Sequence, residues 1–113
     1  MTTKIRQQNG ITILEPNGKI MGPAVSALRT ALSPELEVSD SPRILINFKN
    51  VNKIDSEGLG ALMGVRAVTA RKKGRVGVVN VGKQIKNLIV LSRLVRVFEH
   101  YDSEDAAVSA LSA

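Results

Sequence analysis

The sequence of 113 residues contains no cysteine and few aromatic residues, and these shortages exclude several classes of protein. Without cysteine there is no disulfide, no thiolate nucleophile and no zinc–thiolate site. Aromatic residues make up 3% of the chain, so few rings are present to stack on nucleic-acid bases. The single histidine, His100, has no second histidine with which to build a site. We therefore expect neither a metal centre nor catalytic residues.

Long apolar runs are missing as well. No stretch reaches the roughly 20 apolar residues of a membrane-spanning helix. Met1–Arg6 lacks the apolar core of a signal peptide, and we expect a cytoplasmic protein without membrane insertion. The glycines around Gly58 and Gly60 lack both the lysine of a P-loop and the spacing of a dinucleotide fingerprint. No cofactor and no enzymatic activity are predicted.

Positive charge is in excess, because 16 basic residues outnumber 10 acidic ones and give a net charge of +6. Such an excess is compatible with a nucleic-acid or anionic membrane partner. The basic residues are spread along the chain, however, and the densest group lies within Arg71–Arg75, where a helix is predicted to end. Cations at that position stabilise the helix dipole. We favour this structural role and expect no direct binding of nucleic acid.

The predicted elements alternate along the chain. Asn9-Gly10 is a strong signal for a two-residue hairpin turn, which would join strands at Ile5–Gln8 and Ile11–Glu15. Pro16–Gly18 is expected to end the second strand. Apolar residues recur at helical spacing in four later segments, which begin near Pro23, Asp55, Ile85 and Glu104. Further strands are predicted at Arg43–Phe48, Val76–Val81 and Val95–Phe98. This order implies a mostly parallel sheet with right-handed crossovers.

The helix predicted over Asp55–Lys73 has an apolar stripe, and Gly74 is expected to end it. The stripe consists of Leu59, Leu62, Met63, Ala67 and Ala70. Glycine has no side chain and permits close approach. We expect Gly60 to pack this helix against the sheet, and Gly58 to leave the first turn open to a partner.

The start of this helix is the main candidate for function. The predicted strand end at Phe48–Ile54 leads directly into Asp55 and Ser56. Functional residues gather at the carboxyl ends of strands in open parallel sheets. The Ser56 hydroxyl is also well placed to cap the backbone N–H groups of the helix. From the residues alone, a helix cap and a phosphorylation switch are equally compatible with Ser56.

The segment Val51–Gly60, with its core Ile-Asp-Ser-x-Gly-Leu-Gly, resembles the signature of the STAS family, which includes bacterial anti-sigma factor antagonists. The order of the predicted elements is similar to that of the family over nearly the whole chain. The resemblance implies a fold of the α/β class, with one STAS domain over residues 1–113. Such a domain has a mostly parallel mixed sheet, an N-terminal β-hairpin and about four helices.

The resemblance also implies partner switching. In the family, the serine after the motif aspartate, here Ser56, is phosphorylated by an anti-sigma factor that is also a serine kinase. The unphosphorylated antagonist binds that kinase, phosphorylation ends the binding, and a serine phosphatase restores it. The residues that the resemblance assigns to partner binding are Asp55, Ser56, Glu57, Gly58, Lys19 and Met21.

Two positions depart from the family pattern. Met21 stands where many antagonists have an aspartate, and Glu57 replaces the usual serine or threonine after the phosphorylated serine. The alternative is a STAS scaffold that is not phosphorylated, such as an accessory subunit of a transporter or of a signalling assembly. A nucleic-acid-binding protein is suggested by charge alone. Weak homodimerisation stays open.

Overall fold

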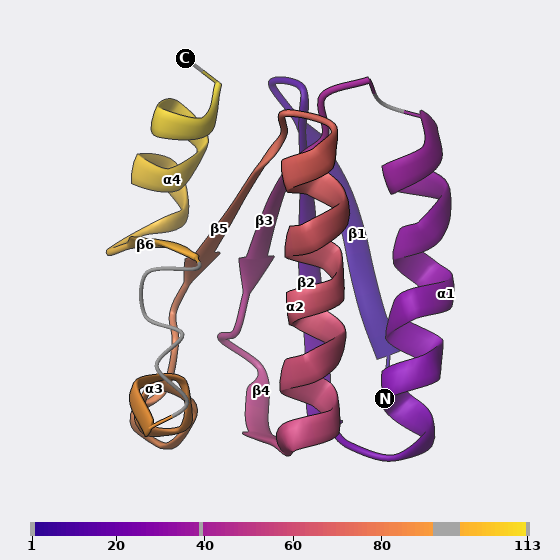
Figure 1. Ribbon diagram of the computed structural model, residues 1–113. Helices are drawn as coiled ribbons and strands as arrows, with labels where there is room; N and C mark the ends of the chain where they lie inside the picture. The colour runs from indigo at the N-terminus through magenta and orange to yellow at the C-terminus, as the bar shows by residue number, and fades with distance from the viewer. Residues whose placement is uncertain (1, 39, 92–97, 113) are drawn as a thin grey trace.

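The structure is a computed structural model that describes residues 2–38, 40–91 and 98–112. Its strands are β1 (Thr2–Gln8), β2 (Ile11–Ile20), β3 (Arg43–Asn47), β4 (Val51–Ile54), β5 (Arg75–Val79) and β6 (Glu99–Tyr101). Its helices are α1 (Pro23–Val38), α2 (Ser56–Arg71), α3 (Lys83–Leu91) and α4 (Glu104–Leu111). The strands form one mixed sheet, with α1, α2 and α3 packed on one face and α4 on the other (Figure 1).

The N-terminal hairpin forms as predicted. Asn9 and Gly10 make its turn with φ values of 52° and 77°, the left-handed conformation that a two-residue hairpin turn favours. The prediction that Pro16–Gly18 ends the second strand is wrong, because β2 continues through this segment. Proline is accommodated here because β2 changes its parallel partner: its pairing with β3 ends at Leu14, and its pairing with β4 begins at Gly18.

Beyond the hairpin, the described strands pair in parallel. β2 pairs with β3, β3 with β5 and β5 with β6, while β4 pairs with the last residues of β2. β4 was not predicted as a separate strand, because two exposed residues between two buried ones give only a short pattern. The last described strand is Glu99–Tyr101, and Phe98 directly precedes it. The rest of the strand predicted at Val95–Phe98 lies outside the described residues.

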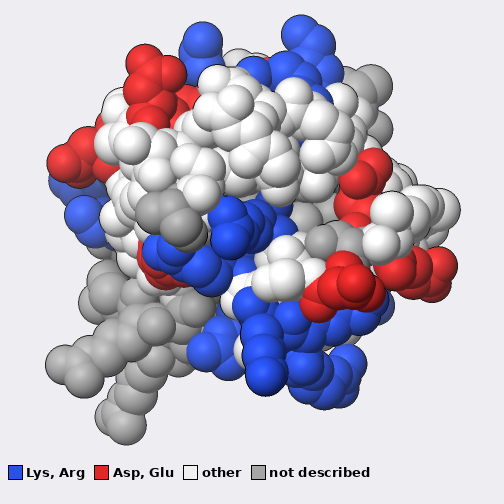
Figure 2. Space-filling view, turned by 90° about the horizontal axis from the view of Figure 1, so that it is seen from above, with Lys and Arg blue, Asp and Glu red and all other residues white. Residues whose placement is uncertain are grey.

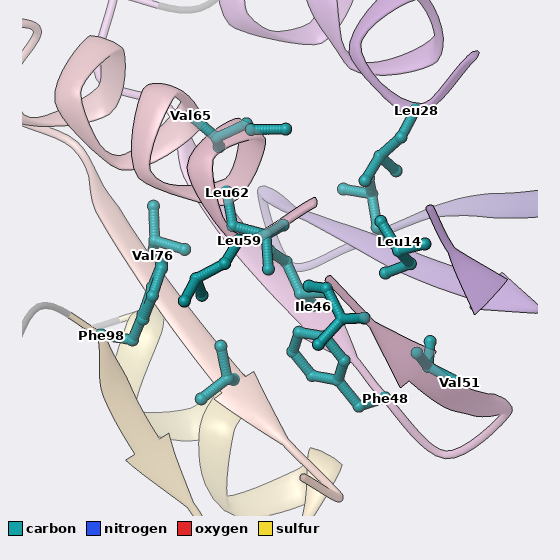
Figure 3. Packing of buried hydrophobic residues seen from close by; sticks show 14 of the residues in the cluster. Leu14, Leu28, Ile46, Phe48, Val51, Leu59, Leu62, Val65, Val76 and Phe98 are labelled. Carbon is teal, nitrogen blue, oxygen red and sulfur yellow. The ribbon is translucent and has the colours of Figure 1, made fainter. Parts of the chain in front are cut away.

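The larger of two hydrophobic cores lies between the sheet and α1–α3. The alternation in β3 sends Ile46 towards this core and Leu45 to the smaller core under α4, as a strand predicts. Figure 3 shows Leu59 and Leu62 of α2 facing the strands, near Phe48. Both leucines are therefore core residues, and the face of α2 next to the sheet has no surface left for a partner.

The buried face of α2 differs from the predicted stripe. Ala67 and Ala70 are exposed, whereas Ala61, Val65 and Thr69 are buried. The prediction assumed that every apolar residue of the helix is buried. Alanine, however, is also common on the exposed side of a helix, because it has the highest helix propensity. Thr69 can be buried because its hydroxyl donates a hydrogen bond to the Arg66 carbonyl at 2.8 Å.

Helix α4 is capped by a serine and is joined to the sheet by polar bonds. The Ser103 side chain accepts a hydrogen bond from the Ala106 N–H at 3.1 Å. The Glu104 carboxylate accepts hydrogen bonds from Arg6 Nη2 at 2.9 Å and from the side-chain amide of the buried Asn47 at 3.0 Å. These bonds satisfy Asn47, the polar residue that shares a strand face with Leu45.

Candidate functional site

The candidate site is the first turn of α2, at the end of the sheet where β4 finishes (Figure 1). Asp55 links β4 to α2. The parallel pairing of β4 with β2 places Lys19 opposite Lys53 and Ile20 opposite Ile54. The segment after β2, which contains Met21, therefore lies beside the start of α2. The structure thus brings the six residues assigned to partner binding to one end of the molecule.

Asp55, not Ser56, is the N-cap of α2. Asp55 has an extended backbone, and its Oδ1 accepts a hydrogen bond from the Gly58 N–H at 2.7 Å. Its carboxylate also lies at the positive end of the helix dipole, where negative charge is favoured. Ser56 is the first residue inside the helix, so the interpretation of its hydroxyl as the cap is wrong.

Ser56 is exposed, and its hydroxyl makes no hydrogen bond within the described part of the chain. Glu57, the next residue, is also exposed. The fold therefore gives the Ser56 side chain no capping or packing role. A serine in this position is open to a modifying enzyme.

The roles predicted for the two glycines are reversed. Gly58 is buried, and a Cβ there would overlap the Ile20 carbonyl oxygen and lie 2.8 Å from Ile54 Cγ1. Gly60 is exposed, and a Cβ there would meet nothing within 4 Å. Gly58 thus packs the first turn against β2 and β4, and the prediction that it leaves the turn open to a partner is wrong. The contact was missed because β4 was not recognised as a strand that brings Ile20 beside α2.

The charges around this turn are mixed. Lys19, Lys53 and Glu57 are exposed, and none of them forms an ion pair with a described residue. Met21 is half-buried, and its carbonyl oxygen accepts a hydrogen bond from the Ala24 N–H at 3.2 Å. Lys53 was not among the predicted site residues, and only the pairing of β4 with β2 identifies it. Unpaired charges of both signs are available here for contact with another molecule.

Two other kinds of site are not found in the parts of the chain that the structure describes. No three histidine, aspartate or glutamate side chains lie close enough to hold a metal ion among residues 2–38, 40–91 and 98–112. Among the same residues, no helix is both long enough and apolar enough to cross a membrane.

The mixed sheet, its N-terminal hairpin and the capped helix that presents an exposed serine define an α/β domain of a known kind. The chain belongs to the STAS domain family, because the model of that family matches residues 2–107. This match confirms the resemblance that the Val51–Gly60 segment suggested.

Several of the proteins that are similar to this chain are named anti-sigma factor antagonists. It is 23% identical over 108 residues to an anti-sigma F factor antagonist of Paenibacillus polymyxa, covering 96% of this chain and 92% of that one. An anti-sigma factor antagonist from Mycobacterium paratuberculosis is 26% identical, with a TM-score of 0.82 and coverage of 99% and 94%. The Bacillus cell fate determinant SpoIIAA in its phosphorylated form is 18% identical, with a TM-score of 0.75 and coverage of 96% and 99%. The last of these shows the same fold.

Proposed function

We propose that this chain is a cytoplasmic anti-sigma factor antagonist whose binding to a serine-kinase anti-sigma factor ends when Ser56 is phosphorylated. The observation that carries the proposal is that Ser56 is exposed at the start of α2 while Asp55 does the capping. Capping therefore does not account for a serine at position 56, and this supports a signalling role for its hydroxyl. The similarity to proteins named anti-sigma factor antagonists supports the same assignment.

The local charges explain how a phosphate would act. A phosphoserine carries about −1.5 to −2 charges at neutral pH. At Ser56 it would be stabilised by the N-terminus of α2 and repelled by the neighbouring Asp55 and Glu57. These opposing effects leave the domain little reason to change shape. The main effect would then fall on the bound partner.

The partner would meet new charge and bulk on a complementary surface. A like-charge contact or an unpaired buried charge costs several kcal/mol at an interface. A penalty of about 3 kcal/mol lowers affinity roughly a hundredfold, which is enough to release a partner. We assign the partner surface to the exposed or half-buried residues of the site, with Gly58 beneath them. These residues are Lys19, Met21, Asp55, Ser56 and Glu57.

The chain itself performs no catalysis in this proposal. The kinase is the anti-sigma factor, and a separate serine phosphatase returns the antagonist to its binding form. Regulation of transcription is therefore indirect, through the sigma factor that the anti-sigma factor releases. No contact with nucleic acid is needed.

Binding measurements with Ser56 variants test the proposal. The serine-kinase anti-sigma factors of the same organism are purified and assayed for transfer of phosphate from ATP, and mass spectrometry of peptides locates the phosphate. We expect it on Ser56, and we expect Ser56→Ala to accept none while keeping its affinity for the kinase. Ser56→Asp should weaken binding roughly a hundredfold.

The matched control is Ser109→Asp, which adds the same charge to an exposed serine of α4. It should bind the kinase like the unmodified chain. Equal binding by Ser56→Asp, Ser56→Ala and the control would refute the switch. That outcome, together with stable binding to a partner, is what a scaffold without phosphorylation predicts.

A further inference from the structure

A groove between α1 and α2 is lined by none of the residues that we assign to the proposed switch. The two helices lie side by side on the same face of the sheet (Figure 1). The groove has a volume of about 260 Å³. Its lining on the α1 side is Arg29, Leu32, Ser33 and Leu36, and on the α2 side Ala61, Gly64, Val65 and Val68. Each set has the spacing i, i+3, i+4 and i+7, so one face of each helix borders the groove.

Small residues of α2 leave the groove open. Gly64 has no side chain, and a Cβ placed there would meet nothing within 4 Å. Ala61 contributes only a methyl group beside it. The floor is formed by buried aliphatic side chains, of which Leu32 and Val65 belong to the main core. A concave, mostly apolar site with few polar groups is the usual form of a small-molecule site.

The polar groups of the groove are unevenly distributed. Arg29 is exposed, and its guanidinium makes no hydrogen bond or ion pair with a described residue. The Ser33 hydroxyl is already used, because it donates to the Arg29 carbonyl at 3.0 Å. No acidic side chain lines the groove. Arg29 is therefore the lining group that would select the charge of a ligand, and it favours an anion.

The groove has a direction. Both helices follow parallel crossovers and run the same way, so Arg29 and Ala61 lie towards one end and Leu36 and Val68 towards the other. At the second end, Lys72 Nζ donates to the Leu36 carbonyl at 2.7 Å and joins α2 to α1. A ligand would thus have its charged group near Arg29 and its apolar part directed towards this joined end.

We propose that the groove binds a small amphipathic monocarboxylate of the fatty-acid type. Its carboxylate pairs with Arg29, which offers the forked donor geometry that carboxylates fit. Its hydrocarbon chain lies between the two helices and is removed from water. This binding site is separate from the first turn of α2, so the inference does not depend on the proposed switch.

Titration of the full chain with octanoate, followed by two-dimensional ¹H–¹⁵N NMR, tests the proposal. The backbone amides of Gly64 and Gly60 are paired probes, because both glycines lie on α2 and only Gly64 lines the groove. We expect a saturable shift at Gly64 and little change at Gly60. Octanol, which has the same chain without the charge, should bind about tenfold more weakly. Arg29→Gln should remove this preference for the acid.

Two glycine variants give a second, independent readout. Gly64→Leu fills the groove and should abolish octanoate binding. Gly60→Leu is the matched control, since it places the same side chain on an exposed position of the same helix that does not line the groove, and it should keep wild-type affinity. Thermal unfolding confirms that both variants are folded. No saturable shift at Gly64, or undiminished binding by folded Gly64→Leu, would overturn the site, and equal affinity for octanol would overturn the role of Arg29.

Discussion

The two ends of α2 use their residues in opposite ways. At the N-terminal end, Asp55 and Gly58 hold the turn in place, whereas the side chains of Ser56 and Glu57 are exposed and make no hydrogen bond or ion pair with a described residue. At the C-terminal end, Lys72 Nζ donates to the Leu36 carbonyl; just beyond this end, Arg75 Nε of β5 donates to Glu99 Oε2 of β6 at 3.0 Å. The comparison separates an end that is available to a partner from an end that is tied to the fold.

The C-terminal end also has its own close contact. Gly74 donates its N–H to the Thr69 carbonyl at 2.6 Å, and a Cβ there would overlap the Pro42 carbonyl oxygen. Figure 2 views the molecule from this side and shows many lysine and arginine side chains across it. Lys72 and Arg75, two of the basic residues of this dense group, are bonded to neighbouring elements and so have a structural role.

Gly58→Ala should have the largest effect on stability and directly tests whether the N-terminal turn is anchored. The added methyl group would overlap Ile20 and crowd Ile54, and overpacking of this kind costs about 1–3 kcal/mol. Urea denaturation of the purified variant measures the change. A variant as stable as the unmodified chain would mean that the turn is not fixed against β2.

Asp55→Ala should have the next largest effect, because it removes the cap of α2. Loss of an aspartate N-cap costs about 1 kcal/mol. Asp55→Asn keeps an acceptor and should recover most of that loss. Ser56→Ala should change the free energy of unfolding by less than about 0.5 kcal/mol, as surface substitutions do. If Ser56→Ala destabilised the chain as much as Asp55→Ala, the division of roles between these neighbours would be incorrect.

Much of the fold could be predicted because its signals are local. The hairpin follows from Asn9-Gly10, and the parallel strands follow from alternation with helices. The two-sided pattern of β3 also follows from the alternation of its residues. β4 was missed because its four residues pair only with the far end of β2, which was expected to stop at Pro16.

That one error accounts for most of what was wrong at the site. Without β4, nothing in the sequence shows that the backbone at Ile20 presses on the first turn of α2. Gly58 and Gly60 were therefore given each other's roles. Asp55 and Ser56 could still be proposed as the site from the sequence, because they carry the family signature and follow a predicted strand end. The sequence could not show whether Asp55 or Ser56 caps the helix, because that depends on which of the two has the extended backbone of an N-cap residue.

Gly60→Ala should stabilise the chain, whereas Gly58→Ala should destabilise it, so the pair of variants tests the different packing of these two glycines. Gly60 is exposed in the helix, and nothing lies within 4 Å of a Cβ placed there. Alanine in a helix interior is favoured over glycine by about 0.5–1 kcal/mol. The midpoint of urea denaturation should rise by a corresponding amount. A decrease would show that Gly60 packs closely against another part of the molecule.

The smallest effect is expected from Glu99→Gln at the C-terminal end, and it should depend on pH. Hydrogen bonding from Arg75 lowers the pKa of Glu99 below its ordinary value. A carboxylate with a lowered pKa in the folded chain stabilises it above its unfolded pKa of about 4.3, and this contribution is lost as pH falls through the lowered value. Arg75 and Glu99 have side chains 38% and 39% exposed, so screening keeps the effect below about 0.5 kcal/mol.

Urea denaturation at neutral pH and at about pH 3 measures this effect, since the two conditions lie on either side of the unfolded pKa. Glu99→Gln should lose less stability between the two than the unmodified chain. Glu57→Gln is the matched variant at the other end of α2, where the carboxylate has no ion pair within the described residues. It should change the pH dependence less than Glu99→Gln. Equal changes in both variants would contradict the contrast, because they would mean that the paired Glu99 contributes no more charge stabilisation than the unpaired Glu57.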